Sequence, residues 1–314
     1  MQNVIEVEGL KKFYPLAKKN ENGEKEFQAV KGTSFFVKKG EIFGILGPNG
    51  AGKTTTLEIL ECLKPQTEGN ITVLGVDNKT HPGEIKKRIG VQLQSSDYLP
   101  YLTLGELLDL FSSLYKGTQK STDLLALVNL VDKEHEQVKS LSGGQKQRFT
   151  IATSLVNKPE ILFLDEPTTG LDPSARRNLW MLIKQINETG ITIVLTTHYM
   201  EEAEFLCNRV AIMDKGKILE IDEPKKLIER LSKTTQLSFL VSKPIDHDIF
   251  KNAPGVTEIY SEFPKITLEI SSLDHIGSIV NLLKQHSIDF SGFVVKTATL
   301  EDVYLDLTGH SFEE

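Results

Sequence analysis

Three apolar runs along the chain predict strands that are buried on both faces. They lie at residues 41–46, 161–164 and 191–196. Each run is continuous rather than alternating between apolar and polar positions, as in parallel strands that are covered by helices. Helical spacing follows the first run at residues 55–63 and recurs at 103–115, 122–131 and 145–157. This order predicts an α/β domain with a helical insertion at about residues 95–157.

The N-terminal segment has the pattern of a strand pair. Residues 4–7 predict a first strand, and a charged segment at 18–25 is centred on Asn22-Gly23. That dipeptide suits a tight hairpin turn because both residues tolerate positive φ. The hairpin arms would lead out from Tyr14 and return through residues 27–37. Short strand patterns follow at 70–74 and 89–94.

The pattern changes after residue 222 and predicts a second, smaller domain. A short helix is expected at 224–231. It is followed by strand 236–242, helix 246–252, strands 256–261 and 265–271, helix 274–286 and strand 288–295. This β-α-β-β-α-β order predicts a small α+β ferredoxin-like domain, which would end in a helix at 299–307. The expected domains are therefore residues 1–232 and 233–314.

Composition places the chain among ordinary globular proteins. Its 314 residues suffice for two domains, and 39% are hydrophobic and 25% charged. The net charge of −7 argues against nucleic acid as the main partner. Cys62 and Cys207 are far apart and lack metal-ligand spacing, so they are expected to be reduced thiols of a cytosolic protein. No apolar run is long enough to span a membrane, and the N-terminus has no signal-peptide pattern.

Residues 47–54 fit the phosphate-binding pattern G-x-x-x-x-G-K-[ST] without a departure. The glycines allow a tight turn that aims backbone N–H groups at phosphate oxygens. The loop follows a predicted strand and begins a predicted helix, whose dipole favours anions. A chance Gly-rich turn is the alternative, and the strand-loop-helix context argues against it. The expected nucleotide-binding residues are Gly47, Pro48, Asn49, Gly50, Ala51, Gly52, Lys53, Thr54 and Thr55.

Two carboxylates end the strand at 161–164, where ligand crevices open in such sheets. Asp165 is expected to hold Mg²⁺, usually through water, together with the hydroxyl of Thr54. Glu166 is expected to orient or deprotonate an attacking water. A polar strand end before a turn at Pro167 is the simpler interpretation, which the phosphate loop makes less attractive. Residues 141–145 begin a helix whose N-terminus could bind a second phosphate, although alone they would indicate only a capped helix.

Found together and in this order, these segments resemble the ABC (ATP-binding cassette) ATPases over residues 1 to about 230. Residues 47–54 resemble the Walker A segment, 141–145 the signature and 161–166 Walker B. The resemblance implies a P-loop NTPase fold, with a RecA-like core, an antiparallel β-subdomain and a helical subdomain. It also implies ATP and Mg²⁺ as ligands. Two cassettes would close head-to-tail, so that one signature caps the ATP of the other through Ser142, Gly143, Gly144 and Gln145.

The same resemblance implies roles for four further residues. Gln94 resembles the Q-loop glutamine, which lies between Mg²⁺ and the membrane partner, and His198 the switch histidine that contacts the γ-phosphate. Asp172 resembles the D-loop aspartate, although an aspartate before Pro173 also suits a helix N-cap. Tyr14 resembles the aromatic residue that stacks on adenine, but the insertion at 15–28 departs from the family. The alternative for Gln94 is a surface glutamine, and the alternative for His198 is a structural histidine.

Residues 298–309 resemble the ending of bacterial exporter cassettes for drugs, antibiotics or sodium. The implied function is the ATP-hydrolysing subunit of an ABC exporter, peripheral on the cytoplasmic face of the membrane. It would pair with a second ATPase subunit and drive a separate permease. A soluble ABC ATPase of DNA repair or translation is the alternative. Such proteins typically have a coiled-coil insertion or two tandem cassettes, whereas this chain has one phosphate loop, one signature and no long heptad run.

Overall fold

The computed structural model describes residues 2–16, 25–93, 98–115, 119–231 and 235–312. Contacts between residues divide the chain into two compact units, one ending at Pro224 and the other spanning Lys225–Phe312. The sequence places its domain boundary at residues 232–233, after helix α8 (Pro224–Leu231), whereas this division precedes most of that helix.

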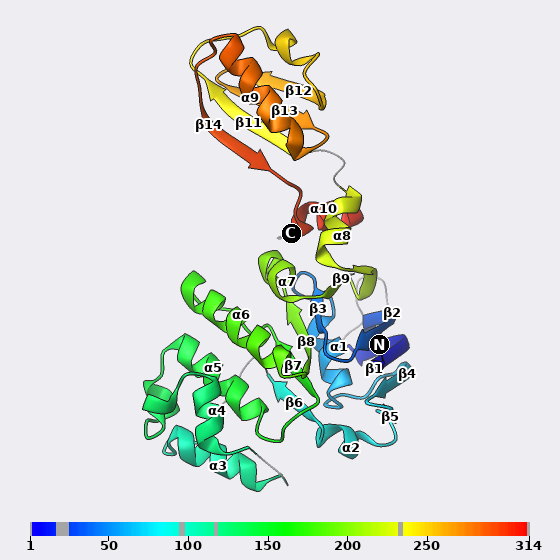
Figure 1. The fold of residues 1–314 in the computed structure, drawn as a ribbon. Helices are drawn as coiled ribbons and strands as arrows, with labels where there is room; N and C mark the ends of the chain where they lie inside the picture. Colours follow the sequence, from blue (N-terminus) through cyan, green and yellow to red (C-terminus); the bar gives the residue numbers. More distant parts are fainter. Residues whose placement is uncertain (1, 17–24, 94–97, 116–118, 232–234, 313–314) are drawn as a thin grey trace. The chain divides into compact units, whose positions relative to one another are not determined.

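The first unit is built on a six-stranded sheet (Figure 1). The sheet order is β10-β9-β3-β8-β7-β6, and all neighbouring strands are parallel except the β9–β10 pair. The three continuous apolar runs form β3, β7 and β8, and every residue of these strands is buried, as predicted. The strands span Ile42–Leu46 (β3), Ile89–Gln92 (β6), Ile161–Asp165 (β7), Thr192–Thr197 (β8), Arg209–Asp214 (β9) and Lys217–Asp222 (β10).

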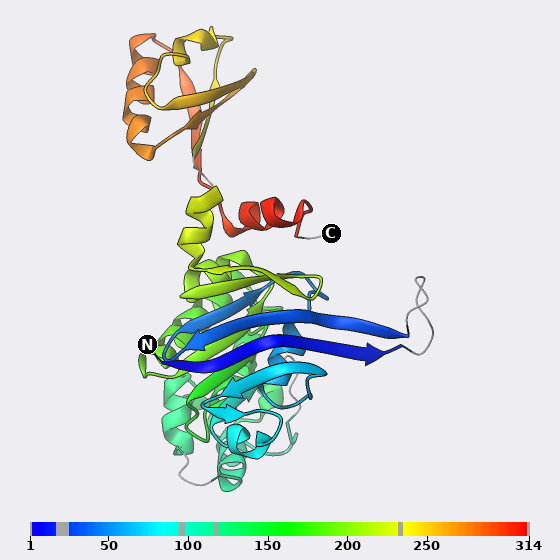
Figure 2. The same cartoon turned by 90° about the vertical axis from the view of Figure 1, so that its right-hand side faces the viewer.

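A four-stranded antiparallel sheet packs against this core. Its order is β2-β1-β4-β5, with bounds Asn3–Pro15 (β1), Glu26–Lys38 (β2), Glu68–Val73 (β4) and Val76–Asp77 (β5). Figure 2 shows β1 and β2 as a long ribbon, drawn in dark blue. The expected turn at Asn22-Gly23 lies outside the described residues. Helix α1 (Lys53–Leu60) places Leu57 in one apolar cluster with Val7 of β1 and Phe43 of β3, so both sheets share a core.

Three helices gather into the helical insertion that the sequence predicts (Figure 1). These are α3 (Leu104–Ser113), α4 (Ser121–Leu127) and α5 (Gly143–Ser154). Helix α4 ends before the expected residue 131 because Asn129 adopts a left-handed φ of 55°, a conformation that terminates helices. The remaining helices of this unit are α2 (Pro82–Lys86), α6 (Pro173–Glu188) and α7 (Met200–Leu206), of which the sequence analysis missed α2 and α7. In the part of the chain that the structure describes, no helix has both the length and the apolar character needed to cross a membrane.

The second unit has an antiparallel sheet of order β12-β13-β11-β14. After α8, its elements are β11 (Thr235–Val241), β12 (Val256–Glu262), β13 (Lys265–Ile270), α9 (Ile276–Gln285), β14 (Phe290–Lys296) and α10 (Leu300–Thr308). The helix expected at 246–252 is wrong, since only a 3₁₀ turn forms there, at His247–Phe250. Pro254 disfavours helical backbone at the residue before it, and Gly255 has a left-handed φ of 77°. The turn still buries Phe250 against the sheet.

Strand β6 approaches helix α5 closely at Gly90. A Cβ at this position would lie 2.0 Å from the carbonyl oxygen of Ser154. We therefore expect Gly90→Ala to lower the free energy of unfolding by about 2–3 kcal/mol, because backbone must move to admit the methyl group. The urea midpoint measures this change. Gly83→Ala, where a Cβ meets nothing within 4 Å, is the matched control, and equal midpoints for the two variants would contradict the close approach.

Candidate functional site

The loop between β3 and α1 is shaped for phosphate by its glycines. Gly50 and Gly52 have positive φ angles of 79° and 102°, which other residues rarely adopt. Gly47 must lack a side chain for a different reason, since a Cβ there would lie 2.2 Å from the backbone oxygen of Met213. The loop then runs directly into α1, so the positive end of the helix dipole lies at the loop.

The Lys53 ammonium group is held among oxygens at this loop. Its Nζ donates to the carbonyl oxygens of Gly47, at 2.8 Å, and Pro48, at 3.1 Å. It also lies 3.2 Å from Oε1 of Glu166, and the Lys53 side chain is only 4% exposed. Burial lowers the pKa of Lys53, while the nearby carboxylates of Glu166 and Asp165 act in the opposite direction. Phosphate oxygens entering the loop could therefore replace contacts that Lys53 already makes.

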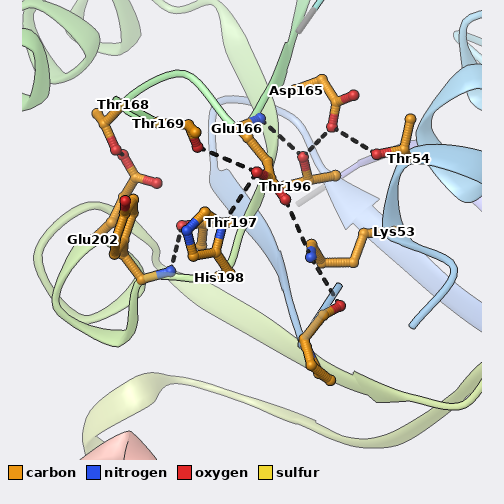
Figure 3. Close-up of polar contacts among 12 residues, drawn as sticks. Lys53, Thr54, Asp165, Glu166, Thr168, Thr169, Thr196, Thr197, His198 and Glu202 are labelled. Atoms are coloured by element: carbon orange, nitrogen blue, oxygen red, sulfur yellow. Dashed lines mark hydrogen bonds and ion pairs between the residues drawn. The ribbon is translucent and has the colours of Figure 1, made fainter. Parts of the chain in front are cut away.

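Two hydroxyl groups converge on the carboxylate of Asp165. Thr54 Oγ1 donates to Oδ1 over 3.2 Å, and Thr196 Oγ1 donates to the same oxygen over 2.5 Å (Figure 3). Burial raises the pKa of Asp165, and these two hydrogen bonds lower it. Hydroxyl and carboxylate oxygens are hard donors of the kind that Mg²⁺ prefers, and a nucleotide-bound Mg²⁺ needs only one or two protein ligands. These residues thus fit Mg²⁺, although the described residues contain no cluster of three or more His, Cys, Asp or Glu side chains suited to a metal.

Glu166 is the centre of the polar network in Figure 3. Its carboxylate contacts Lys53 through Oε1, while Oε2 accepts a hydrogen bond from Thr169 Oγ1 at 3.2 Å and lies 3.1 Å from His198 Nδ1. Its backbone has a left-handed φ of 48°, and its N–H donates to Thr196 Oγ1 at 3.0 Å. Strained backbone of this kind is concentrated at functional sites. The network fixes the carboxylate at the mouth of the phosphate loop.

A hollow of about 280 Å³ connects the phosphate loop with the β1–β2 ribbon. It is lined by Tyr14, Phe27, Ala29, Asn49, Gly50, Gly52, Lys53, Thr54, Thr55 and Glu166. Tyr14 therefore lies on the same hollow as the loop, and its stacking on adenine stays a prediction. Phe27 was not anticipated from the sequence.

The predicted signature residues lie at the start of α5, where Ser142 and Gln145 form a capping box. Ser142 Oγ accepts from the N–H of Gln145 at 3.3 Å, and Gln145 Oε1 accepts from the N–H of Ser142 at 2.9 Å. Gly143 and Gly144 form the first turn. No residue of 141–145 is among the described residues that line the hollow. Within the described residues, the signature segment is therefore not part of the wall of this hollow.

Two further predicted residues have different outcomes. Asp172 caps α6, since its Oδ1 accepts from the backbone N–H groups of Ser174 and Ala175, each at 2.9 Å. The N-cap role, which the sequence left open, is thus present, and the D-loop role stays a prediction. Gln94 lies outside the described residues, so its role also stays a prediction.

The sequence analysis missed a buried carboxyl group behind the site, that of Glu202 on α7. Its side chain is fully buried, and its Oε1 accepts hydrogen bonds of 2.9 Å from Thr168 Oγ1 and from Trp180 Nε1. Burial raises its pKa. The group links α7 with α6 and with the loop that follows Glu166. The sequence signal was weak, since it amounts to a glutamate four residues after His198 in a segment for which no helix was predicted.

A second carboxyl group, that of Glu61, is buried at the end of α1. Its side chain is 1% exposed, and in the described structure its Oε1 has no hydrogen-bond partner. Burial raises the pKa of Glu61 to about 8, and the charges of Asp165 and Glu58 add to the shift. Glu61 lines another hollow, of about 240 Å³, with Lys86 and Tyr115.

Known proteins resemble this chain closely. A family model described as ABC transporter matches residues 30–169. The linearmycin resistance ATP-binding protein LnrL of Bacillus subtilis is 34% identical over 99% of this chain and 100% of its own. The Nod factor export ATP-binding protein I of Ralstonia nicotianae is 34% identical over 99% and 95%. Among solved structures, a dimeric ATP-binding cassette in a post-hydrolysis state with ADP and phosphate has a TM-score of 0.62 and 29% identity, covering 70% of this chain and 98% of its own.

The raised pKa of Glu61 predicts a pH-dependent stability. Between its ordinary pKa of 4.5 and about 8, the folded state keeps a proton that the unfolded state has lost, so the free energy of unfolding falls as pH rises through this window. Glu61→Gln removes this titration. We expect wild-type stability, relative to that variant, to fall by about 3 kcal/mol between pH 5 and pH 9, measured by urea unfolding. The exposed Glu188→Gln controls for loss of any carboxylate, and a difference that is independent of pH would contradict the protonated state.

Proposed function

We propose that the network around Glu166 hydrolyses ATP to drive a separate membrane protein. The premise is that this chain belongs to the ABC transporter family and is an ATP-binding subunit of the exporter type. One observation carries the proposal. The carboxylate of Glu166 joins Lys53 of the phosphate loop to His198 after β8, beside the Thr54–Asp165 contact. These are the parts that phosphoryl transfer to water requires, in one place.

The residues at the loop would bind and orient the nucleotide. Backbone N–H groups of residues 47–54 and the ammonium of Lys53 would hold the β- and γ-phosphates. Thr54 and Asp165 would hold Mg²⁺, joined by Gln94 as the resemblance implies. When bound, Mg²⁺ neutralises charge on the β- and γ-phosphate oxygens.

Glu166 and His198 would carry out the chemical step. Glu166 would orient the attacking water and accept its proton as the bond between the γ-phosphorus and the bridging oxygen breaks. ADP and inorganic phosphate are the products. His198, 3.1 Å from that carboxylate, would contact the γ-phosphate and hold Glu166 in position.

The second phosphate-binding surface would come from another subunit. The start of α5 is exposed at Ser142 and Gly143, and neither residue lines the loop's own hollow. We therefore propose a head-to-tail pair of cassettes, in which residues 142–145 and Asp172 of one chain complete the site of the other. Since this chain has both the loop and the signature, a twofold homodimer is self-complementary, and a heterodimer with a related subunit uses the same surfaces.

The membrane partner would bind near the end of β6. Gln94, which follows β6 closely, resembles a residue that lies between Mg²⁺ and the partner. The hollow of about 240 Å³ that contains Glu61, Lys86 and Tyr115 is lined in part by Val91 of β6. We propose this hollow as the contact with an integral membrane permease, which would place the chain on the cytoplasmic face. The relatives described above are named for linearmycin resistance and for Nod factor export, so a soluble role in DNA repair or translation gains no support.

Removing the charge of Glu166 should separate ATP binding from hydrolysis. We expect Glu166→Gln to bind Mg²⁺-ATP within about threefold of wild type but to hydrolyse it at least about 100-fold more slowly, because the amide cannot accept the proton. Stalled turnover should also accumulate an ATP-bound dimer in size-exclusion chromatography. In contrast, Lys53→Ala should lose ATP binding itself. Full turnover by purified Glu166→Gln would refute the proposed role of this carboxylate.

Capture of the tagged chain from detergent-solubilised membranes tests the partner. We expect a multi-span membrane protein at stoichiometric yield, identified by mass spectrometry. Lys86→Glu, which reverses a charge at the proposed contact, should reduce that yield about tenfold, whereas the exposed Lys79→Glu should not. Recovery of only ribosomal or DNA-bound proteins, with the chain absent from membranes, would favour the soluble alternative.

A further inference from the structure

The imidazole of His198 has an aromatic neighbour, the ring of Tyr199. The centroids of the two rings are 4.1 Å apart, and their planes are inclined at 42°. The Nδ1 atom of the imidazole lies 3.1 Å from Oε2 of Glu166 (Figure 3). A single hydrogen bond fixes one ring nitrogen but leaves the ring free to tilt about that contact. The neighbouring Tyr199 ring can therefore decide the tilt.

Tyr199 is itself held at both its backbone and its side chain. It directly precedes α7, and its N–H donates a hydrogen bond of 2.9 Å to the Oγ1 atom of Thr197 at the end of β8. The guanidinium carbon of Arg176 lies 4.0 Å from the centroid of its ring, well within the range of a cation–π contact. The Tyr199 ring thus contacts both the imidazole and a guanidinium group.

The position of Arg176 is explained by that ring and by a buried carboxyl group. Arg176 is half-buried on α6, and its Nε atom is buried without a hydrogen-bond partner among the described residues. Burial raises the pKa of Glu202, and the charge of Arg176 acts against this shift, so the guanidinium and this carboxyl group attract each other. Contacts therefore run from Glu202 in the interior through Arg176 and Tyr199 to His198.

We propose that Tyr199, held by Arg176, is a positioning residue that fixes the tilt of the His198 imidazole for hydrolysis. The inference rests on the proposed function, in which His198 contacts the γ-phosphate while its Nδ1 stays at Glu166. Both contacts use the same ring, so a small rotation would lengthen one or the other. Orientation of a group that acts in the transition state affects turnover more than ATP affinity, so Tyr199 acts on kcat.

Truncation of the ring tests the proposal first. We expect Tyr199→Ala to lower kcat about tenfold while ATP affinity in calorimetry stays within about twofold of wild type. Tyr199→Phe should keep the wild-type kcat, because the ring and not the hydroxyl contacts the imidazole. Arg176→Gln keeps the ring but removes the cation over it, and should lower kcat about threefold. The exposed Arg177→Gln is the matched control and should leave kcat unchanged.

A double-variant cycle separates positioning of His198 from a general structural role. If Tyr199 acts only through His198, then Tyr199→Ala should cause no further loss of turnover in a His198→Ala background. A residue that merely stabilises α7 would lower the residual turnover of His198→Ala as well. Urea midpoints of all variants, measured alongside, show that each compared protein is folded.

Three results would overturn the inference. They are an unchanged kcat in Tyr199→Ala, a Tyr199→Phe variant as slow as Tyr199→Ala, and losses of Tyr199→Ala and His198→Ala that multiply in the double variant. The first would remove Tyr199 from the hydrolysis step, the second would assign its effect to the hydroxyl, and the third would show that it acts independently of His198. Full turnover in His198→Ala alone would instead contradict the proposed function of His198.

Discussion

The ion pair between Lys53 and Glu166 holds the site together. Two charges with side chains less than 10% exposed would be costly to bury if they were not paired and hydrogen-bonded. Here the ammonium also meets two loop carbonyls, and the carboxylate also meets Thr169 and His198. Removal of one partner would leave an uncompensated buried charge. The pair therefore makes the loop, the end of β7 and the end of β8 mutually dependent.

That dependence is set by the register of parallel strands. Leu46 lies opposite Thr197 in the β3–β8 pair, and Asp165 lies opposite Thr196 in the β7–β8 pair. The three strands thus end level with one another, and the residues that follow them meet at one edge of the sheet. The sequence predicted both the strands and the polar residues at their ends. Meeting at a shared edge follows from parallel pairing, which the continuous apolar pattern indicates.

Other contacts could not be predicted, because they depend on pairing between distant segments. Thr196 ends a predicted strand, but nothing in its local pattern says that its hydroxyl reaches Asp165. Phe27 escaped notice for a similar reason, since the register across the insertion at 15–28 decides which residue faces Tyr14. The helix expected at 246–252 is only a 3₁₀ turn at His247–Phe250, and Pro254, which disfavours helical backbone just before it, is a local signal that the expectation did not use.

The buried contact of Glu202 with Trp180 has an optical consequence. Trp180, on α6, is the chain's single tryptophan. Its indole N–H donates a hydrogen bond to the carboxyl group of Glu202 on α7, and its ring stacks on Phe205, also on α7, with 5.2 Å between the ring centroids. Any displacement of α7, which begins two residues after His198, changes the polarity around that indole. Tryptophan emission from the unlabelled protein is therefore an intrinsic fluorescence signal for α7 and the segment that follows β8, free of background from other indoles.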